Sequence, residues 1–123
     1  MTVFTEGRHA AEFVMEELGV NFARDTITIV SGAGVIAPGT VLGKITASGK
    51  YKPSTATGAD GGQTAVALNL YEVDATSADV EVAAITRGAT VNGKLIAYDS
   101  TVDDDAKKAA KATQLAAAQI IVR

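Results

Sequence analysis

The sequence contains no cysteine, and this absence excludes several kinds of chemistry. Without thiols, the 123-residue chain forms no disulfide, uses no thiolate nucleophile and builds no zinc site of the usual cysteine-containing kind. The one histidine, His9, has no second group tied to its position, and none of the many serines and threonines has an identifiable base. We therefore expect no active site, no metal, no cofactor and no small-molecule substrate.

Aromatic residues are also scarce. There is no tryptophan, and phenylalanine and tyrosine occur three times each. Because aromatic side chains contribute the largest buried area per residue, a core built mainly of alanine, valine and isoleucine is thin. A chain of this length forms one domain that buries roughly two-thirds of the surface of its unfolded state. We expect this domain to be helped by oligomerisation.

Positive charge is sparse and scattered. The formal net charge is −3, and no lysine or arginine occurs between Pro53 and Thr86. A nucleic-acid-binding protein needs clustered positive charge to displace counterions from phosphates. No apolar run approaches the ~20 residues that cross a bilayer, and the first residues lack the apolar segment of a signal peptide. We expect neither a nucleic-acid nor a membrane partner, and synthesis in the cytoplasm.

Most of the chain after Asp25 has the patterns of β-strands. The alternating or β-branched runs are 26–29, 41–46, 64–70 and 80–86. Ser48-Gly49 predicts a tight turn, and residues 74–79 are interpreted as another turn. Asn92-Gly93 stands between apolar positions, which predicts a β-hairpin.

One α-helix is predicted near the C-terminus, at about 103–115. Thr101 and Asp104 have the spacing of N-cap residues, and three successive acids meet the positive end of the helix dipole. Residues 120–122 return to β propensity and can close the chain into a sheet. Residues 11–16 fit either a strand or a short amphipathic helix. We predict a mainly β fold, with an N-terminal arm and first β segment at 1–25 and a β-rich domain at 26–123.

Two glycine-containing stretches imitate nucleotide-binding motifs. Residues 32–37, GAGVIA, satisfy the dinucleotide-binding fingerprint, but Pro38-Gly39 follows where that fingerprint needs a helix. Residues 43–51, GKITASGKY, have one residue too many for a phosphate-binding loop, and Tyr51 replaces its magnesium-binding Ser or Thr. We interpret the first stretch as turns between two strands and the second as a hairpin.

The acids at 103–105 do not predict a metal site. Successive helical residues point about 100° apart, so three in a row do not converge on one ion. Compensation of the helix dipole is the better interpretation of these carboxylates.

Several stretches together resemble the phage and prophage head decoration proteins, the family of the lambda head decoration protein. They are FTEG at 4–7, GTVLGKITASGKY at 39–51, DGGQTA at 60–65, the acids at 103–105, the paired lysines at 107–108 and IIV at 120–122. The N-terminal third departs from the family because it is longer and more apolar. The resemblance implies a small β-rich homotrimer on the outer surface of the virion capsid. There it would bind the expanded head at local three-fold sites and stabilise the shell against packaged DNA.

The resemblance also implies a role for the N-terminal arm in binding the major capsid protein. Strand addition to a partner sheet would supply backbone hydrogen bonds, with Phe4 and Phe13 as apolar anchors. The expected capsid-binding residues are Phe4, Thr5, Glu6, Gly7, Arg8, His9 and Phe13.

The alternative function is a small β-rich carrier of the lipoyl or biotinyl kind, or a protein-binding domain. A carrier needs a modifiable lysine at a hairpin tip, flanked by Asp or Met. Lys50 lies between Gly49 and Tyr51, and Lys94 is flanked by glycine and leucine, so neither lysine matches. An enzyme is the third interpretation, and no activity suggests itself.

Overall fold

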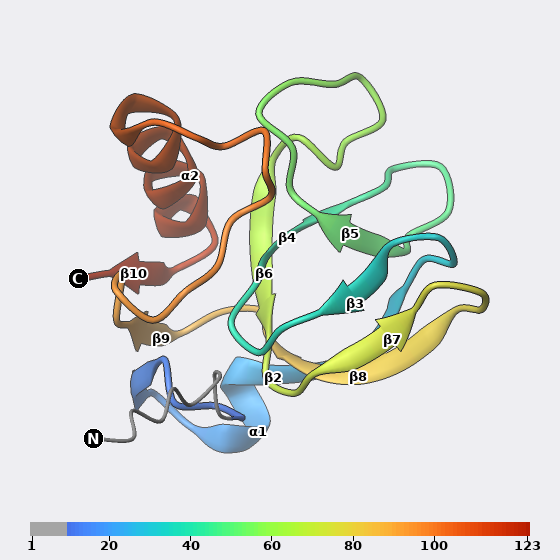
Figure 1. The fold of residues 1–123 in the computed structure, drawn as a ribbon. Helices are drawn as coiled ribbons and strands as arrows, with labels where there is room; N and C mark the ends of the chain where they lie inside the picture. Colours follow the sequence, from blue (N-terminus) through green and yellow to red (C-terminus); the bar gives the residue numbers. More distant parts are fainter. Residues whose placement is uncertain (1–9) are drawn as a thin grey trace, which may run out of the picture.

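The computed structural model describes residues 10–123, apart from the side chain of Val20. Its central strands are β2 (Arg24–Ile29), β4 (Val41–Lys44), β5 (Tyr51–Pro53), β6 (Ala65–Asn69) and β8 (Val80–Ile85). They form a closed barrel in the order β2-β5-β4-β6-β8 (Figure 1). Neighbouring strands are antiparallel, except that β2 and β5 meet in parallel at Ile29 and Tyr51. Closure removes the exposed edges that an open sheet presents.

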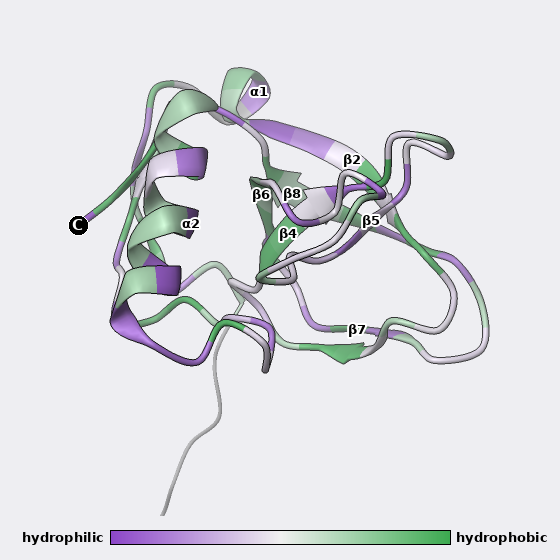
Figure 2. Cartoon of the chain, turned by 90° about the horizontal axis from the view of Figure 1, so that it is seen from above, coloured by the Kyte–Doolittle hydropathy of each residue, from purple (hydrophilic) through white to green (hydrophobic). Residues whose placement is uncertain are grey.

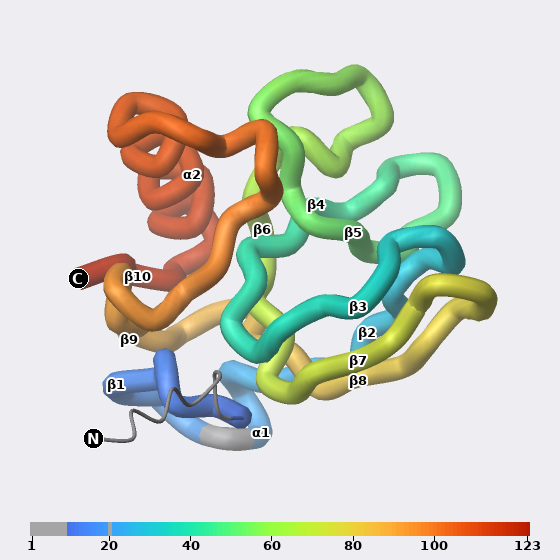
Figure 3. Tube along the Cα trace, in the orientation of Figure 1, coloured from blue at the N-terminus to red at the C-terminus, as the bar shows by residue number. Residues whose placement is uncertain are grey.

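Two smaller sheets and two helices surround the barrel. The further elements are β1 (Val14–Glu17), α1 (Val20–Ala23), β3 (Gly34–Ile36), β7 (Val73–Ala75), β9 (Ala89–Val91), α2 (Asp105–Ala117) and β10 (Ile120–Val122). β3 and β7 form an antiparallel pair. β9 lies between β1, which is antiparallel to it, and β10, which is parallel to it (Figure 3). The first and last strands of the described chain are thus held by the same central strand.

The predicted C-terminal helix is confirmed, starting and ending two residues later than expected. Asp104 is the N-cap, and its carboxylate accepts a hydrogen bond from the Lys107 amide at 2.8 Å. The Lys107 ammonium group pairs with Asp103 at 2.8 Å, so these acids serve the helix terminus. Figure 2 shows hydrophobic and hydrophilic residues on different sides of α2. Leu115 is on the buried side.

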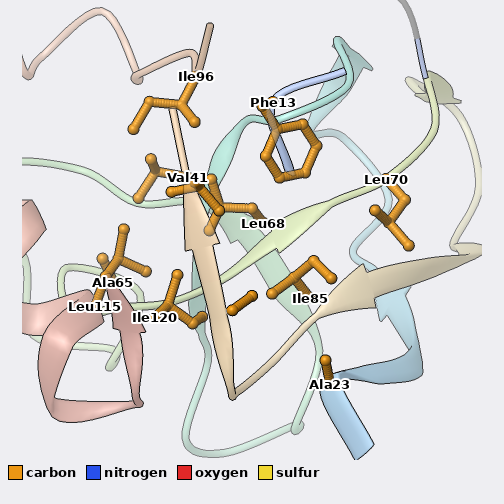
Figure 4. Packing of buried hydrophobic residues seen from close by; sticks show 12 residues of the cluster. Phe13, Ala23, Val41, Ala65, Leu68, Leu70, Ile85, Ile96, Leu115 and Ile120 are labelled. Carbon is orange, nitrogen blue, oxygen red and sulfur yellow. The ribbon is translucent and has the colours of Figure 1, made fainter. Parts of the chain in front are cut away.

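The core consists of small and branched side chains, as the composition predicts. One buried cluster lies between the barrel, α2 and the β1-β9-β10 sheet (Figure 4). A second cluster fills the barrel beneath β3 and β7 and includes Ile27, Ile29 and Leu42. Phe13 is the one aromatic residue of 10–123 that is fully buried.

The two nucleotide-like stretches are turns and strands, as expected. Gly32 and Gly34 have φ angles of +91° and +83°, values that L-residues with side chains rarely adopt, and β3 begins at Gly34. After β3 the next regular element is β4, so no helix follows the fingerprint. β4 and β5 form the predicted hairpin, with Gly49 in its turn at a φ of +72°.

Two turn predictions were partly wrong. Asn92-Gly93 does form a turn, in which Leu95 N donates to Asn92 O at 3.0 Å, but no hairpin follows. Both edges of β9 are already occupied, by β1 and β10, so the chain after the turn instead bridges Ala97 to Thr40.

The segment 74–79 is a turn only in its second half. Its start belongs to β7, which pairs with β3. The Asp74 carboxylate then accepts hydrogen bonds from the Thr76 amide and hydroxyl, which begins the turn. The three-residue strand is too short for an alternating pattern to reveal it. Of the segment 11–16, for which a strand and a short helix were both left open, residues 14–16 belong to β1 and residues 11–13 form a turn.

Candidate functional site

Six of the seven predicted site residues, Phe4, Thr5, Glu6, Gly7, Arg8 and His9, lie outside the described part of the chain. The predicted boundary at residue 25 falls inside β2, and β1 is a paired strand of the domain. The Ala11 amide also donates to the Leu70 carbonyl at 2.9 Å. Residues 10–25 are therefore part of the folded domain, and an arm is limited to residues 1–9.

The seventh predicted site residue, Phe13, is in the core. It is 0% exposed, and its ring packs against Gly39, where an added Cβ would lie 2.8 Å from the ring edge. Its carbonyl oxygen accepts a hydrogen bond from the Asn92 amide at 2.8 Å. The expected role as an apolar anchor on a partner does not fit this placement, because the ring has no surface to offer. No local pattern could have revealed this, since Gly39 is distant in the sequence.

A groove with apolar side chains lies over the β1 and β9 pair. Its volume is about 320 Å³, and Glu16, Gly88 and Thr90 line it. Leu18 and Ile121 also line it, and they are 78% and 39% exposed. We call this surface the β1–β9 groove. The sequence patterns did not identify it, because its members come from separate parts of the chain.

Phe22 extends the apolar surface beside the groove and is 49% exposed. Its ring packs over Gly88, where an added Cβ would lie 2.7 Å from the ring. The Arg87 guanidinium group lies 5.7 Å from the ring centroid and donates to the Phe22 carbonyl at 2.6 Å. Arg87 also pairs with Asp25, and this hydrogen bond holds the pKa of that carboxyl below its ordinary value. The exposed ring thus contacts both Gly88 and the Arg87 guanidinium group.

An ion pair fixes β1 to the start of the barrel. Arg24 donates from Nε and Nη2 to the two carboxylate oxygens of Glu17, at 2.9 and 2.7 Å. The Glu17 side chain is only 13% exposed, and the hydrogen bonds raise the pKa of Arg24. This forked geometry is the most directional ion pair that proteins form, so it orients β1 against β2.

A buried lysine ties α2 to the loop between β5 and β6. Lys111 is 2% exposed, and its Nζ donates to Ser54 Oγ at 3.0 Å and to the carbonyl oxygens of Thr55 and Gln63 at 2.6 and 2.5 Å. Burial lowers the pKa of this ammonium group. Gln114, one turn later, accepts from the first amide of β6 at 2.8 Å. Lys111 and Gln114 of α2 thus fix the loop between β5 and β6, which contains Gly58, Gly61 and Gly62 and is called the glycine-rich loop below.

The described residues offer no metal centre: among 10–123, no group of three His, Asp or Glu side chains could hold an ion. In the same part of the chain, no helix is long and apolar enough to cross a membrane.

The fold and its surfaces define a small β-barrel protein with exposed apolar groups suited to contacts with other proteins. The family model of bacteriophage lambda head decoration protein D matches residues 3–120. Because the match spans nearly the whole chain, the chain belongs to this family, and the resemblance seen in the sequence is confirmed. The family consists of structural phage capsid proteins and is not known for enzymes, so this protein has a capsid decoration role. A search of curated proteins found no match.

Proposed function

We propose that this protein decorates the outer surface of an expanded phage head as a homotrimer at local three-fold sites. There it stabilises the shell against the pressure of packaged DNA. The observation that carries the proposal is the family match over residues 3–120. The net charge of −3 supports an outward position, away from the packaged nucleic acid.

The trimer is supported by the composition of the core. Phe13 is the one large aromatic side chain that residues 10–123 bury completely, while several apolar groups remain exposed. Association would cover part of this exposed surface. Native mass spectrometry or light scattering at micromolar concentration tests this, and we expect a trimer before any capsid is added. A monomer would contradict this part of the proposal.

The proposed capsid partner of the arm is the major capsid protein, bound through Phe4, Thr5, Glu6, Gly7, Arg8 and His9. Four backbone hydrogen bonds at about 1 kcal/mol each, with about 2 kcal/mol from burying Phe4, would contribute roughly 6 kcal/mol. Ordering these six residues costs about 1 kcal/mol each, roughly 6 kcal/mol in all, which cancels this gain. The net free energy of binding through a single arm is thus close to zero, so the contribution of Phe4 decides whether one arm favours attachment. Three arms on one trimer combine through their high effective concentration.

The central experiment mixes the purified protein with expanded, undecorated capsids of its own phage and measures co-sedimentation. We expect the wild-type protein to sediment with the capsids, and EDTA or ATP to leave the bound amount unchanged. If the wild-type protein stays in the supernatant at every concentration, the decoration proposal fails.

A second set of variants tests the arm. Deleting residues 1–9 keeps every described contact of 10–123, so the domain should fold while capsid binding weakens strongly. Phe4→Ala should reduce occupancy as well, whereas Lys108→Ala, a change on the exposed side of α2, should not. If the truncated protein binds capsids as tightly as the full chain, the arm has no part in attachment.

A further inference from the structure

The β1–β9 groove brings exposed apolar side chains from separate parts of the chain onto one surface. Leu18 is 78% exposed at its rim, and Ile121 on β10 forms another wall. The Leu18 amide donates to the Gly88 carbonyl at 2.8 Å, so the backbone beneath the groove is fixed. Phe22, with its ring held over Gly88, continues the surface. Apolar groups on rigid backbone are typical of a binding surface, because little order has to be imposed when a partner arrives.

The groove lies where the chain enters the domain. Residues 10–13 lead directly into β1, and β1 contributes Glu16 to the groove. Phe4 is six residues before Ala10, so it reaches at most about 20 Å from it. A domain of this length is about 35 Å across. A capsid surface that receives Phe4 therefore faces the side of the domain that Ala10 occupies.

The groove is small compared with a stable protein–protein interface, which limits the kind of partner it can bind. A stable interface of standard size buries ~800 Å² on each partner, which is some 20 or more residues a side. Leu18, Phe22 and Ile121 are each only partly exposed and fall well short of that area. The groove alone is too small to hold a trimer together. It suits a weak contact that is repeated three times on one particle.

We propose that the β1–β9 groove is a second docking surface for the major capsid protein, beside the arm. This inference rests on the proposed decoration function. The occupant is an apolar side chain on the outer face of the capsid subunit, inserted between Leu18 and Ile121. A basic group of the same subunit faces Glu16, whose exposed carboxylate pairs with no side chain of the described residues. The Glu17–Arg24 and Asp25–Arg87 pairs are satisfied within the domain.

The test uses full-length protein with Leu18→Ser and Ile121→Thr, introduced separately. Both positions are exposed, so the domain should keep its thermal midpoint, and light scattering should show the same oligomeric state as the wild type. Affinity for expanded capsids should fall about tenfold or more for each variant. Val35→Thr is the matched control, because Val35 is 64% exposed on β3 outside the groove. It should change affinity by less than about twofold.

The possible results separate this inference from the function on which it rests. If the wild type does not bind capsids, the decoration function and the groove contact both fail. If the wild type and both groove variants bind equally, only the groove contact is overturned. If the Leu18→Ser variant fails to form the oligomer that the wild type forms, the groove is a contact between copies of this chain, and the inference is also overturned.

The charge at the rim gives an independent readout. Glu16→Lys should weaken capsid binding most at low salt and less at high salt, because it places like charges together at an exposed site. Equal binding by this variant and the wild type at low salt would show that the capsid subunit places no basic group opposite Glu16.

Discussion

Replacing Phe13 with alanine decides whether this ring belongs to the core or to a capsid contact. Phe13 is 0% exposed and packs on Gly39, where the backbone cannot move in to fill the space without disturbing the turn. Phe→Ala changes at buried positions cost about 3–5 kcal/mol, out of the roughly 5–15 kcal/mol that stabilise a typical domain. We expect Phe13→Ala to lower the free energy of unfolding by about this amount.

The assay is urea unfolding followed by circular dichroism, at one protein concentration for all variants. With a urea dependence of about 2 kcal/mol per molar, the midpoint should fall by roughly 2 M. Phe22→Ala is the control, because that ring is 49% exposed and should cost less than about half as much. An unchanged midpoint for Phe13→Ala, together with weakened capsid binding, would refute the core assignment and restore Phe13 to the arm.

Three further predictions concern stability. Lys111→Met should lower the free energy of unfolding by about 2 kcal/mol or more in urea titrations, because two loop carbonyls lose their donor, while the exposed Lys108→Met should have little effect. Gly43→Ala should lower the thermal midpoint strongly or prevent folding, because the added Cβ would overlap backbone of the glycine-rich loop. Asp79 has a pKa below its ordinary 3.8 through its pair with Lys50, so its contribution is present above that pH and lost below it. The urea midpoint should therefore fall as the pH drops below about 3.8, and less so in Asp79→Asn.

The features that the sequence predicted well are those whose causes are local. The β4–β5 hairpin turns at Gly49, which tolerates the positive φ, and its partners are only a few residues apart. The helix begins where Asp104 can cap it. In both cases the residue that determines the structure lies within the element or beside it, so one short window holds the whole argument.

Strand partners distant in the sequence were not predictable in the same way. The Asn92-Gly93 turn formed, but the expected hairpin did not, because β1 and β10 occupy both edges of β9. The pattern of a strand reports which face is buried and says nothing of which strand fills its edge. The β3–β7 pair was missed for the same reason, since its strands are short and far apart in the chain.

The same difference between local causes and partners distant in the sequence applies to the candidate site. Phe13 was assigned to the arm as an apolar anchor on the basis of the family resemblance, yet its ring packs on Gly39 across the fold. Lys111 follows two other lysines on the helix, and only the tertiary structure separates it as the buried one. The β1–β9 groove is assembled from β1, β9 and β10, so no single stretch contains its pattern.

The position of β9 between the first and last strands has a mechanical consequence. A pull on the N-terminal segment enters the domain at the Ala11–Leu70 hydrogen bond and then runs along β1. The hydrogen bonds between β1 and β9 lie perpendicular to the strands, so tension along the strand axis loads several of them at once. β10, which follows α2, is hydrogen-bonded to the other edge of β9, so part of the tension is transmitted to β10. If the N-terminal segment attaches to the capsid as proposed, tension on it would be carried by β1 and β10, from the two ends of the described chain, and the lifetime of the attachment under load would depend on the unfolding rate of the three-stranded sheet.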